Sequence, residues 1–298
     1  MAAPMVVVVR APGVLSSDGM VRPASLVAMF ERGLSRLTGQ TGAAAGLAAL
    51  FVPTDRVGIK INGIAGRRLT SPPEVTLPLA RLLVRAGLPD QAVTIWDRTN
   101  RELREAGYRL SNSGSEFRVY GTDTVGAGYG AEPLEHRSIA GRFSAIQTEM
   151  VTASISFAVL KDHGLAGLTA GMKNYFGAIH NPNKYHDDGC DPFVADLVDA
   201  PPIRSKHRLT VLDALTVQFN RGPSFHAKWA DRSETLVFGT DPVAVDAVGL
   251  RIVAGLRQAK GLPSLEEDGR PARYLASAER LGLGASSLAA IRVVEESA

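Results

Sequence analysis

Segments rich in β-branched residues alternate with segments of helical periodicity along most of the chain. Apolar runs predict strands at residues 6–10, 56–62, 92–97, 117–120, 154–161, 208–212, 235–238 and 291–295. Helical spacing and capping signals predict helices at residues 26–37, 43–50, 71–86, 102–106, 167–176, 192–198, 242–254 and 273–281. This alternation predicts an α/β protein with a mostly parallel or mixed sheet and helices on both faces, in Rossmann-like layers.

The chain has 298 residues, a length that allows one large domain or two smaller ones. No internal repeat and no low-complexity linker divides it. We therefore expect a single α/β domain over residues 1–298, with two closely packed lobes at 1–150 and 151–298 as the alternative.

Composition excludes several classes of protein. Cys190 is the only cysteine, so the chain holds no internal disulfide, no cysteine-only zinc site and no iron–sulfur cluster. The 33 Lys and Arg residues are nearly balanced by 30 Asp and Glu residues. The densest basic runs, 67–68 and 204–208, are expected to be solvated loops, with a phosphate or carboxylate ligand at one of them as the alternative. We predict no nucleic-acid partner.

Apolar runs are too short for a membrane span, and residues 5–9 indicate a buried strand rather than a signal peptide. We therefore expect a cytoplasmic protein with no membrane partner. An exported form whose leader has been removed is the alternative.

Polar residues follow several predicted strands, at the end of a parallel sheet where ligands collect. Among them, Lys60 and Lys161, together with Lys173 and His163, form the predicted catalytic set. Lysines in such places hold a carboxylate or phosphate, or act as acid or base when desolvated. The alternative is three surface lysines whose stems cover apolar neighbours.

Two further sets are predicted to bind a cofactor or a metal. The cofactor-binding set is Asn62, Asp97, Asn174 and Asp241, although capping of the helix that follows would also explain Asp241. The metal set supplies imidazole and carboxylate ligands suited to a divalent ion: His163, His180, His186, Asp187 and Asp188. No pair has the tight spacing of two ligands on one helical face, so hydrogen-bonded structural histidines and a solvated acidic loop remain open. Lys173 and His180, seven residues apart, would share a face of a continued helix.

Five sequence elements together resemble one known family. They are VGIKIN at 57–62, SPPEV at 71–75, LKDH at 160–163, TAGMKNYFG at 169–177 and DPVAVD at 241–246. Over roughly residues 55–255 the chain resembles the domain of unknown function 362 family. The resemblance implies a bacterial or archaeal protein. Many members carry ferredoxin-like cysteine segments or twin-arginine leaders, and we expect neither in this chain.

The leading hypothesis is a metal- or cofactor-assisted enzyme, an oxidoreductase or isomerase, acting by acid–base or redox chemistry on a small anionic substrate. The cofactor is unknown, and a divalent metal is the candidate. One alternative is a non-catalytic binding protein for an anionic metabolite or prosthetic group. The other is a subunit that docks an external redox partner, which would replace the missing cysteine segment. A homo-oligomer is also open.

Overall fold

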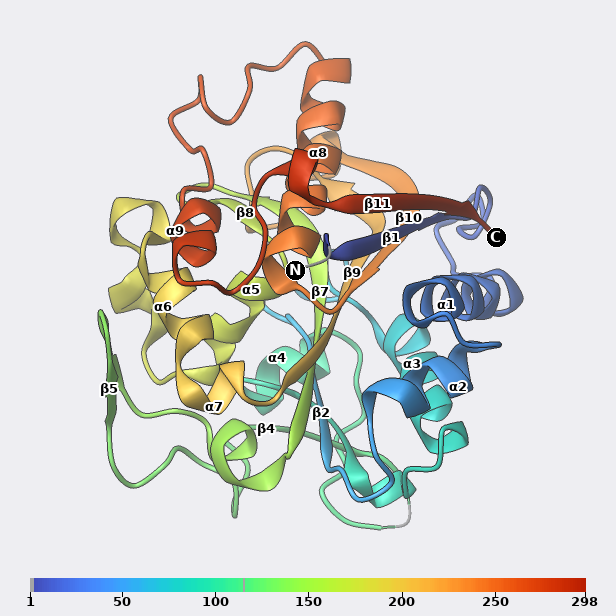
Figure 1. Ribbon diagram of the computed structural model, residues 1–298, viewed down its shortest axis with the longest axis vertical. Helices are drawn as coiled ribbons and strands as arrows, with labels where there is room; N and C mark the ends of the chain where they lie inside the picture. The colour runs from blue at the N-terminus through green and yellow to red at the C-terminus, as the bar shows by residue number, and fades with distance from the viewer. Residues whose placement is uncertain (1–2, 115) are drawn as a thin grey trace.

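The computed structural model describes residues 3–114 and 116–298, and within these ranges the strands form a nine-stranded sheet and a separate two-stranded hairpin (Figure 1). The strand order is β11-β1-β10-β9-β7-β2-β3-β4, with β8 paired to β7. The strands of the sheet are β1 (Met5–Arg10), β2 (Val57–Lys60), β3 (Val93–Asp97), β4 (Arg118–Gly121), β7 (Ala153–His163), β8 (Gly167–Thr169), β9 (His207–Gln218), β10 (Ala230–Gly239) and β11 (Arg292–Ser297). The hairpin consists of β5 (Leu134–His136) and β6 (Ile139–Gly141).

Strand directions confirm the predicted mixed, mostly parallel sheet. Strands β4, β3, β2, β7 and β9 run parallel to one another. Strand β10 lies antiparallel between β9 and β1, and β1 pairs in parallel with β11. The sheet therefore takes strands from both halves of the chain.

Helices cover both faces of the sheet, as predicted (Figure 1). One group comprises α1 (Pro23–Thr38), α2 (Ala43–Leu50), α3 (Pro73–Arg85) and α4 (Asn100–Glu105). The other comprises α5 (Gly171–Asn174), α6 (Phe193–Asp199), α7 (Pro201–Arg204), α8 (Pro242–Ala259) and α9 (Tyr274–Arg280). Alternate residues of a strand enter different cores: Val7 packs in the core with Phe30 of α1, and Val8 in the core with Val248 of α8. A sheet buried on both faces explains why its strands are nearly continuous apolar runs.

The chain leaves the two adjacent strands β2 and β7 in opposite directions across the sheet. From β2 it passes through α3 to β3 on one side, and from β7 it passes through α5, α6 and α7 to β9 on the other. Such a switch in strand order leaves a crevice at the carboxyl ends of the two strands. Lys60 ends β2 and His163 ends β7, so the topology places this crevice beside predicted site residues.

The prediction of one helix over residues 167–176 is wrong. Gly167, at φ 76°, turns the chain back so that β8 pairs antiparallel with β7, and only residues 171–174 form α5. A side chain at Gly167 would lie 2.1 Å from the Arg270 carbonyl oxygen, so the turn requires glycine. After α5 the chain forms a 3-10 turn and is extended at Ile179. Lys173 and His180 therefore do not share a helical face.

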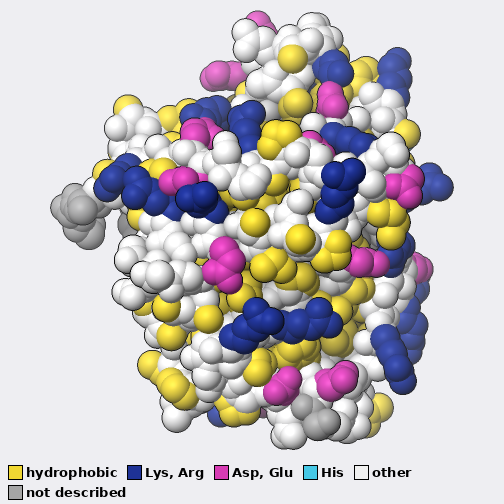
Figure 2. Space-filling model, turned by 90° about the vertical axis from the view of Figure 1, so that its right-hand side faces the viewer, with side chains coloured by type: hydrophobic (Ala, Val, Ile, Leu, Met, Phe, Trp, Pro, Cys, Tyr) yellow, Lys and Arg dark blue, Asp and Glu magenta, His cyan; other side chains and the backbone are white. Residues whose placement is uncertain are grey.

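None of the helices in the described ranges combines the length and apolar character of a membrane span. On the face of the molecule shown in Figure 2, Lys and Arg side chains lie interspersed with acidic and apolar ones.

Candidate functional site

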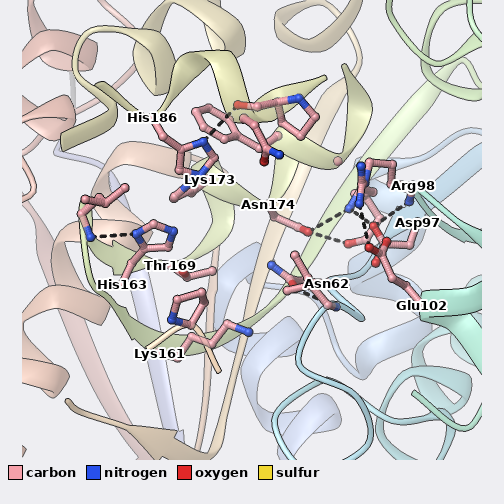
Figure 3. A pocket seen from close by; sticks show the side chains of 18 of the residues that line it. Asn62, Asp97, Arg98, Glu102, Lys161, His163, Thr169, Lys173, Asn174 and His186 are labelled. Carbon is pink, nitrogen blue, oxygen red and sulfur yellow. Dashed lines mark hydrogen bonds and ion pairs between the residues drawn. The ribbon is translucent and has the colours of Figure 1, made fainter. Parts of the chain in front are cut away.

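A cavity of about 360 Å³ lies at the carboxyl ends of β2, β3 and β7. Its walls come from these strand ends, from β8, from α5 and from the segment that follows α5 (Figure 3). Eight of the predicted site residues line it: Lys60, Asn62, Asp97, Lys161, His163, Lys173, Asn174 and His186. The cavity therefore lies at the switch between β2 and β7, where an open α/β sheet binds ligands.

Lys60 and Asp97 form a buried ion pair on one wall. Lys60 Nζ lies 2.6 Å from Asp97 Oδ1 and donates a second hydrogen bond to Asn174 Oδ1 at 3.2 Å. The Asn174 amide nitrogen donates in turn to the Lys60 carbonyl oxygen and to Ser156 Oγ. Asp97 Oδ2 accepts the Gly63 N–H at 2.6 Å. These contacts tie the ends of β2 and β3 to α5, and the charges of Lys60 and Asp97 cancel.

Lys161 occupies a different environment. Its side chain is fully buried in the cavity wall, and its Nζ finds no hydrogen-bond partner within the described part of the chain. The pKa of Lys161 is lowered to about 7, mainly by burial; the Asp97 charge opposes this change and the nearby Lys173 charge adds to it. Lys161 is thus poised to exchange a proton near neutral pH.

Thr169 lies opposite Lys161 in the β7–β8 pairing and also lines the cavity. Its hydroxyl is buried and, among the residues described, has no hydrogen-bond partner. Two polar atoms without partners, facing one cavity from paired strands, are an arrangement that a polar ligand can satisfy.

His163 is held as a neutral hydrogen-bond donor. Its Nδ1 accepts the backbone N–H groups of Leu165 and Ala166 at 3.2 and 3.1 Å. Because Nδ1 carries no proton in this arrangement, the neutral ring carries it on Nε2. Burial lowers the pKa of His163 to about 2, with Lys173 adding to the effect. Nε2–H donates rather than accepts, so it does not offer a metal the lone pair that ligation needs.

Lys173 of α5 supplies positive charge to the cavity. Its Nζ lies 3.2 Å from His186 Nε2 and 3.9 Å from the centre of the Phe176 ring. His186 Nδ1 lies 3.0 Å from the Pro182 carbonyl oxygen, so it donates there and leaves Nε2 to accept from Lys173. Burial lowers the pKa of Lys173 to about 8, while the Cys190 thiol raises it. Lys173 thus remains largely charged at pH 7.

Arg98 and Glu102 form a further pair at the cavity, with 2.9 Å between the guanidinium and Glu102 Oε1. Like the Lys60–Asp97 pair, it contributes no net charge. Lys161 and Lys173 are the remaining cationic side chains among the lining residues. The cavity is therefore electropositive and favours an anion.

Asp246 of α8 holds the N-terminal end of the short helix α5. Its two carboxylate oxygens accept the N–H groups of Gly171 and Met172 at 2.7 and 3.1 Å. Burial raises the pKa of Asp246 to about 7. This contact joins α8 to α5 and so fixes the residues Lys173 and Asn174 that α5 presents to the cavity.

The predicted cofactor-binding residue Asp241 does not reach the cavity. Its Oδ1 accepts the N–H groups of Val243 and Ala244, both at 2.9 Å, and its Oδ2 accepts that of Ala285. Asp241 is therefore the cap of α8, the alternative that the sequence left open.

The five predicted metal ligands are not brought together. His180 is exposed and packs edge-on against Tyr129, because the chain is extended after the 3-10 turn. Asp187 and Asp188 are exposed on a later 3-10 turn, Asp187–Cys190. Only His163 and His186 meet, with stacked rings 5.6 Å apart. Residues 3–114 and 116–298 contain no group of three or more His, Cys, Asp or Glu side chains placed to hold a metal ion.

Sequence reasoning missed three residues of the site: Thr169, Arg98 and Glu102. Thr169 was assigned to a helix, and its role depends on the β7–β8 pairing. Arg98 and Glu102 carry a signal that could have found them, since they follow the β3 strand end at the i, i+4 spacing of a helical ion pair.

Comparison with known proteins adds a family but no activity. No curated protein matches the chain. A crystal structure of a protein from Thermotoga maritima is 12% identical and matches over 81% of this chain and 60% of its own length, with a TM-score of 0.45. This chain thus spans less than two thirds of that protein. The model of the domain of unknown function 362 matches residues 57–251, well over half of the sequence. The chain therefore belongs to the domain of unknown function 362 family.

Proposed function

We propose that this cavity binds a small anionic molecule and that Lys161 transfers a proton to or from it. One observation carries the proposal: Lys161 Nζ is buried at the cavity and has no hydrogen-bond partner among the described residues. A lysine placed only for stability would be paired or would reach water. Its pKa of about 7 suits a group that both accepts and donates a proton at neutral pH.

The other lining residues support a division of roles. Lys173 attracts the anionic group, and the Thr169 hydroxyl and His163 Nε2–H supply hydrogen bonds to its oxygen atoms. The Lys60–Asp97 pair and Asn174 hold the wall rigid. Within the described residues no three metal-binding side chains are gathered at one place, whereas Lys161 and His163 both line the cavity, so the proposal is acid–base chemistry.

Hydrogen–deuterium exchange at carbon tests the proposal without knowledge of the product. The protein is incubated in D₂O with small 2-hydroxy, 2-amino and 2-oxo acids. NMR follows the loss of the C2–H signal of the hydroxy and amino acids and of the C3–H signal, next to the ketone, of the oxo acids. We expect exchange with at least one class, its loss in Lys161→Met, and wild-type rates in Lys228→Met, which alters an exposed lysine outside the cavity. Exchange that persists in Lys161→Met would remove Lys161 from the mechanism. Calorimetric binding without exchange would instead favour a binding protein.

A further inference from the structure

We infer that the ligand is an amphipathic anion, with its charged end at Lys161 and Lys173 and an apolar group at the cavity mouth against Ile64 and Leu165. This inference rests on the proposed function and specifies the class of molecule that the site accepts.

Exposed apolar side chains are few, and two of them lie at this cavity. Six large hydrophobic residues are exposed in the described part of the chain, and two of them, Ile64 at 57% and Leu165 at 54%, line this one cavity. Exposed apolar residues that stand singly are ordinary. Two at the same cavity form an apolar surface of the kind that binds a ligand.

The topology explains why both residues lie at this cavity. Ile64 lies in the loop after β2, and Leu165 lies in the turn between β7 and β8. Because β2 and β7 are neighbours, their following loops flank the same crevice. The two side chains thus stand on opposite sides of the switch that also presents Lys60 and Lys161.

Further apolar side chains line the same cavity. Phe176, Pro182 and Pro223 also line the cavity, and Phe176 is 5% exposed. Its ring contacts the Lys173 ammonium group. The apolar wall and the cationic group are therefore contiguous, and one molecule can contact both. A small ligand is favoured over a protein partner because the rim and the buried lysines belong to a single cavity.

Straight-chain carboxylates of increasing length test the inference by calorimetry. The probes are butanoate, hexanoate and octanoate, with 1-hexanol as the uncharged counterpart of hexanoate. We expect each added methylene to tighten Kd about two- to fourfold, since burial of one CH₂ is worth at most about fourfold in affinity. In the double variant Ile64→Ser/Leu165→Ser the chain-length dependence should fall to nearly none. Hexanol should bind far more weakly than hexanoate.

Val52→Ser is the matched control, because Val52 is 55% exposed and does not line the cavity. It should keep the wild-type chain-length dependence. Thermal melts check that all variants fold. An unchanged dependence in the double variant would overturn the inference.

The experiment separates the proposed function from the inference that rests on it. Suppose that the wild type binds all three carboxylates with the same Kd and that butanoate binding disappears in Lys161→Met. This result would overturn the inference that the ligand has an apolar end and would leave the proposed function standing. A wild-type protein that binds no carboxylate of any length would overturn both. Equal binding of hexanol and hexanoate would contradict the anionic end.

Discussion

Lys161 on β7 and Thr169 on β8 face each other in antiparallel register, and within the described residues neither Lys161 Nζ nor Thr169 Oγ1 has a hydrogen-bond partner. Both side chains are buried in the wall of one cavity. A buried polar group without a partner costs about 1–3 kcal/mol. This pair therefore marks the place where the oxygen atoms of a bound anion gain most.

Thr169→Val should separate stability from binding. Valine has nearly the same shape and removes a hydroxyl that bonds to nothing in the described protein, so the free energy of unfolding should stay level or rise by up to about 1 kcal/mol. Anion affinity should fall about five- to tenfold, the value of one hydrogen bond. Urea denaturation and calorimetric titration measure the two effects.

Thr76→Val provides the contrast. Thr76 is equally buried, but its hydroxyl accepts a hydrogen bond from Tyr108 at 2.8 Å. Its loss should lower the free energy of unfolding by about 1 kcal/mol and leave anion affinity unchanged. A Thr169→Val variant that is destabilised as much as Thr76→Val would show that the Thr169 hydroxyl serves the fold.

Lys161 should be the lysine most reactive toward cyanate at pH 7. With a pKa of about 7 it is about half unprotonated there, whereas an ordinary lysine is unprotonated to about one part in 2,500. Cyanate is a small anion that the cavity should admit. Peptide mass mapping should find Lys161 carbamoylated at least about tenfold faster than the exposed Lys228. Equal rates at the two lysines would contradict a desolvated Lys161 open to the cavity.

His163 should make the protein lose stability in acid. Its pKa is lowered to about 2 in the folded protein, whereas the unfolded chain takes up the proton near pH 6.5. The unfolded state therefore binds more protons below pH 6.5, and the contribution of His163 is lost as the pH falls. Its slope is at most about 1.4 kcal/mol per pH unit.

His163→Gln should remove this slope, since glutamine does not titrate. Urea denaturation from pH 4.5 to 7.5 compares the free energies of unfolding of wild type, His163→Gln and His226→Gln. The last changes an exposed histidine and should follow the wild type. If His163→Gln loses stability in acid as steeply as the wild type, His163 is not held neutral.

The layered fold could be predicted because its signals are local. The apolar run at 57–60 and the helical spacing at 26–37 each specify an element without reference to the rest of the chain. Ligands of α/β proteins bind at the carboxyl ends of the parallel strands, and this rule predicts that Lys60, Lys161 and Asp97 lie at one edge of the sheet, where the cavity is found.

The five residues of the predicted metal set do not come together, because their meeting depended on a chain path that local sequence signals do not determine. Residues 167–176 carry helical spacing, but Gly167 turns the chain into a strand that pairs with β7. After α5 the chain makes a 3-10 turn and is extended at Ile179, so His180 does not line the cavity. That the Thr169 hydroxyl has no partner among the described residues is a property of tertiary packing, so sequence spacing could not indicate it.

Gly177→Ala should disturb the wall that holds the Lys60–Asp97 pair. A Cβ at Gly177 would lie 2.6 Å from Lys60 Nζ and 3.0 Å from Asp97 Oδ1. Lys60 cannot move aside freely, since its ammonium group is bound by Asp97, Asn174 and the Ile61 carbonyl oxygen. We expect the free energy of unfolding to fall by about 1–3 kcal/mol, as for other overpacked sites.

Gly255→Ala is the matched control for this substitution. Gly255 lies within α8, and a Cβ there would meet nothing within 4 Å. Alanine should raise the free energy of unfolding by up to about 1 kcal/mol, because it is the better helix former. The two variants add the same methyl group and should therefore differ in sign in urea denaturation. A Gly177→Ala protein as stable as wild type would mean that the Lys60–Asp97 pair relaxes at no cost and is not a rigid wall of the site.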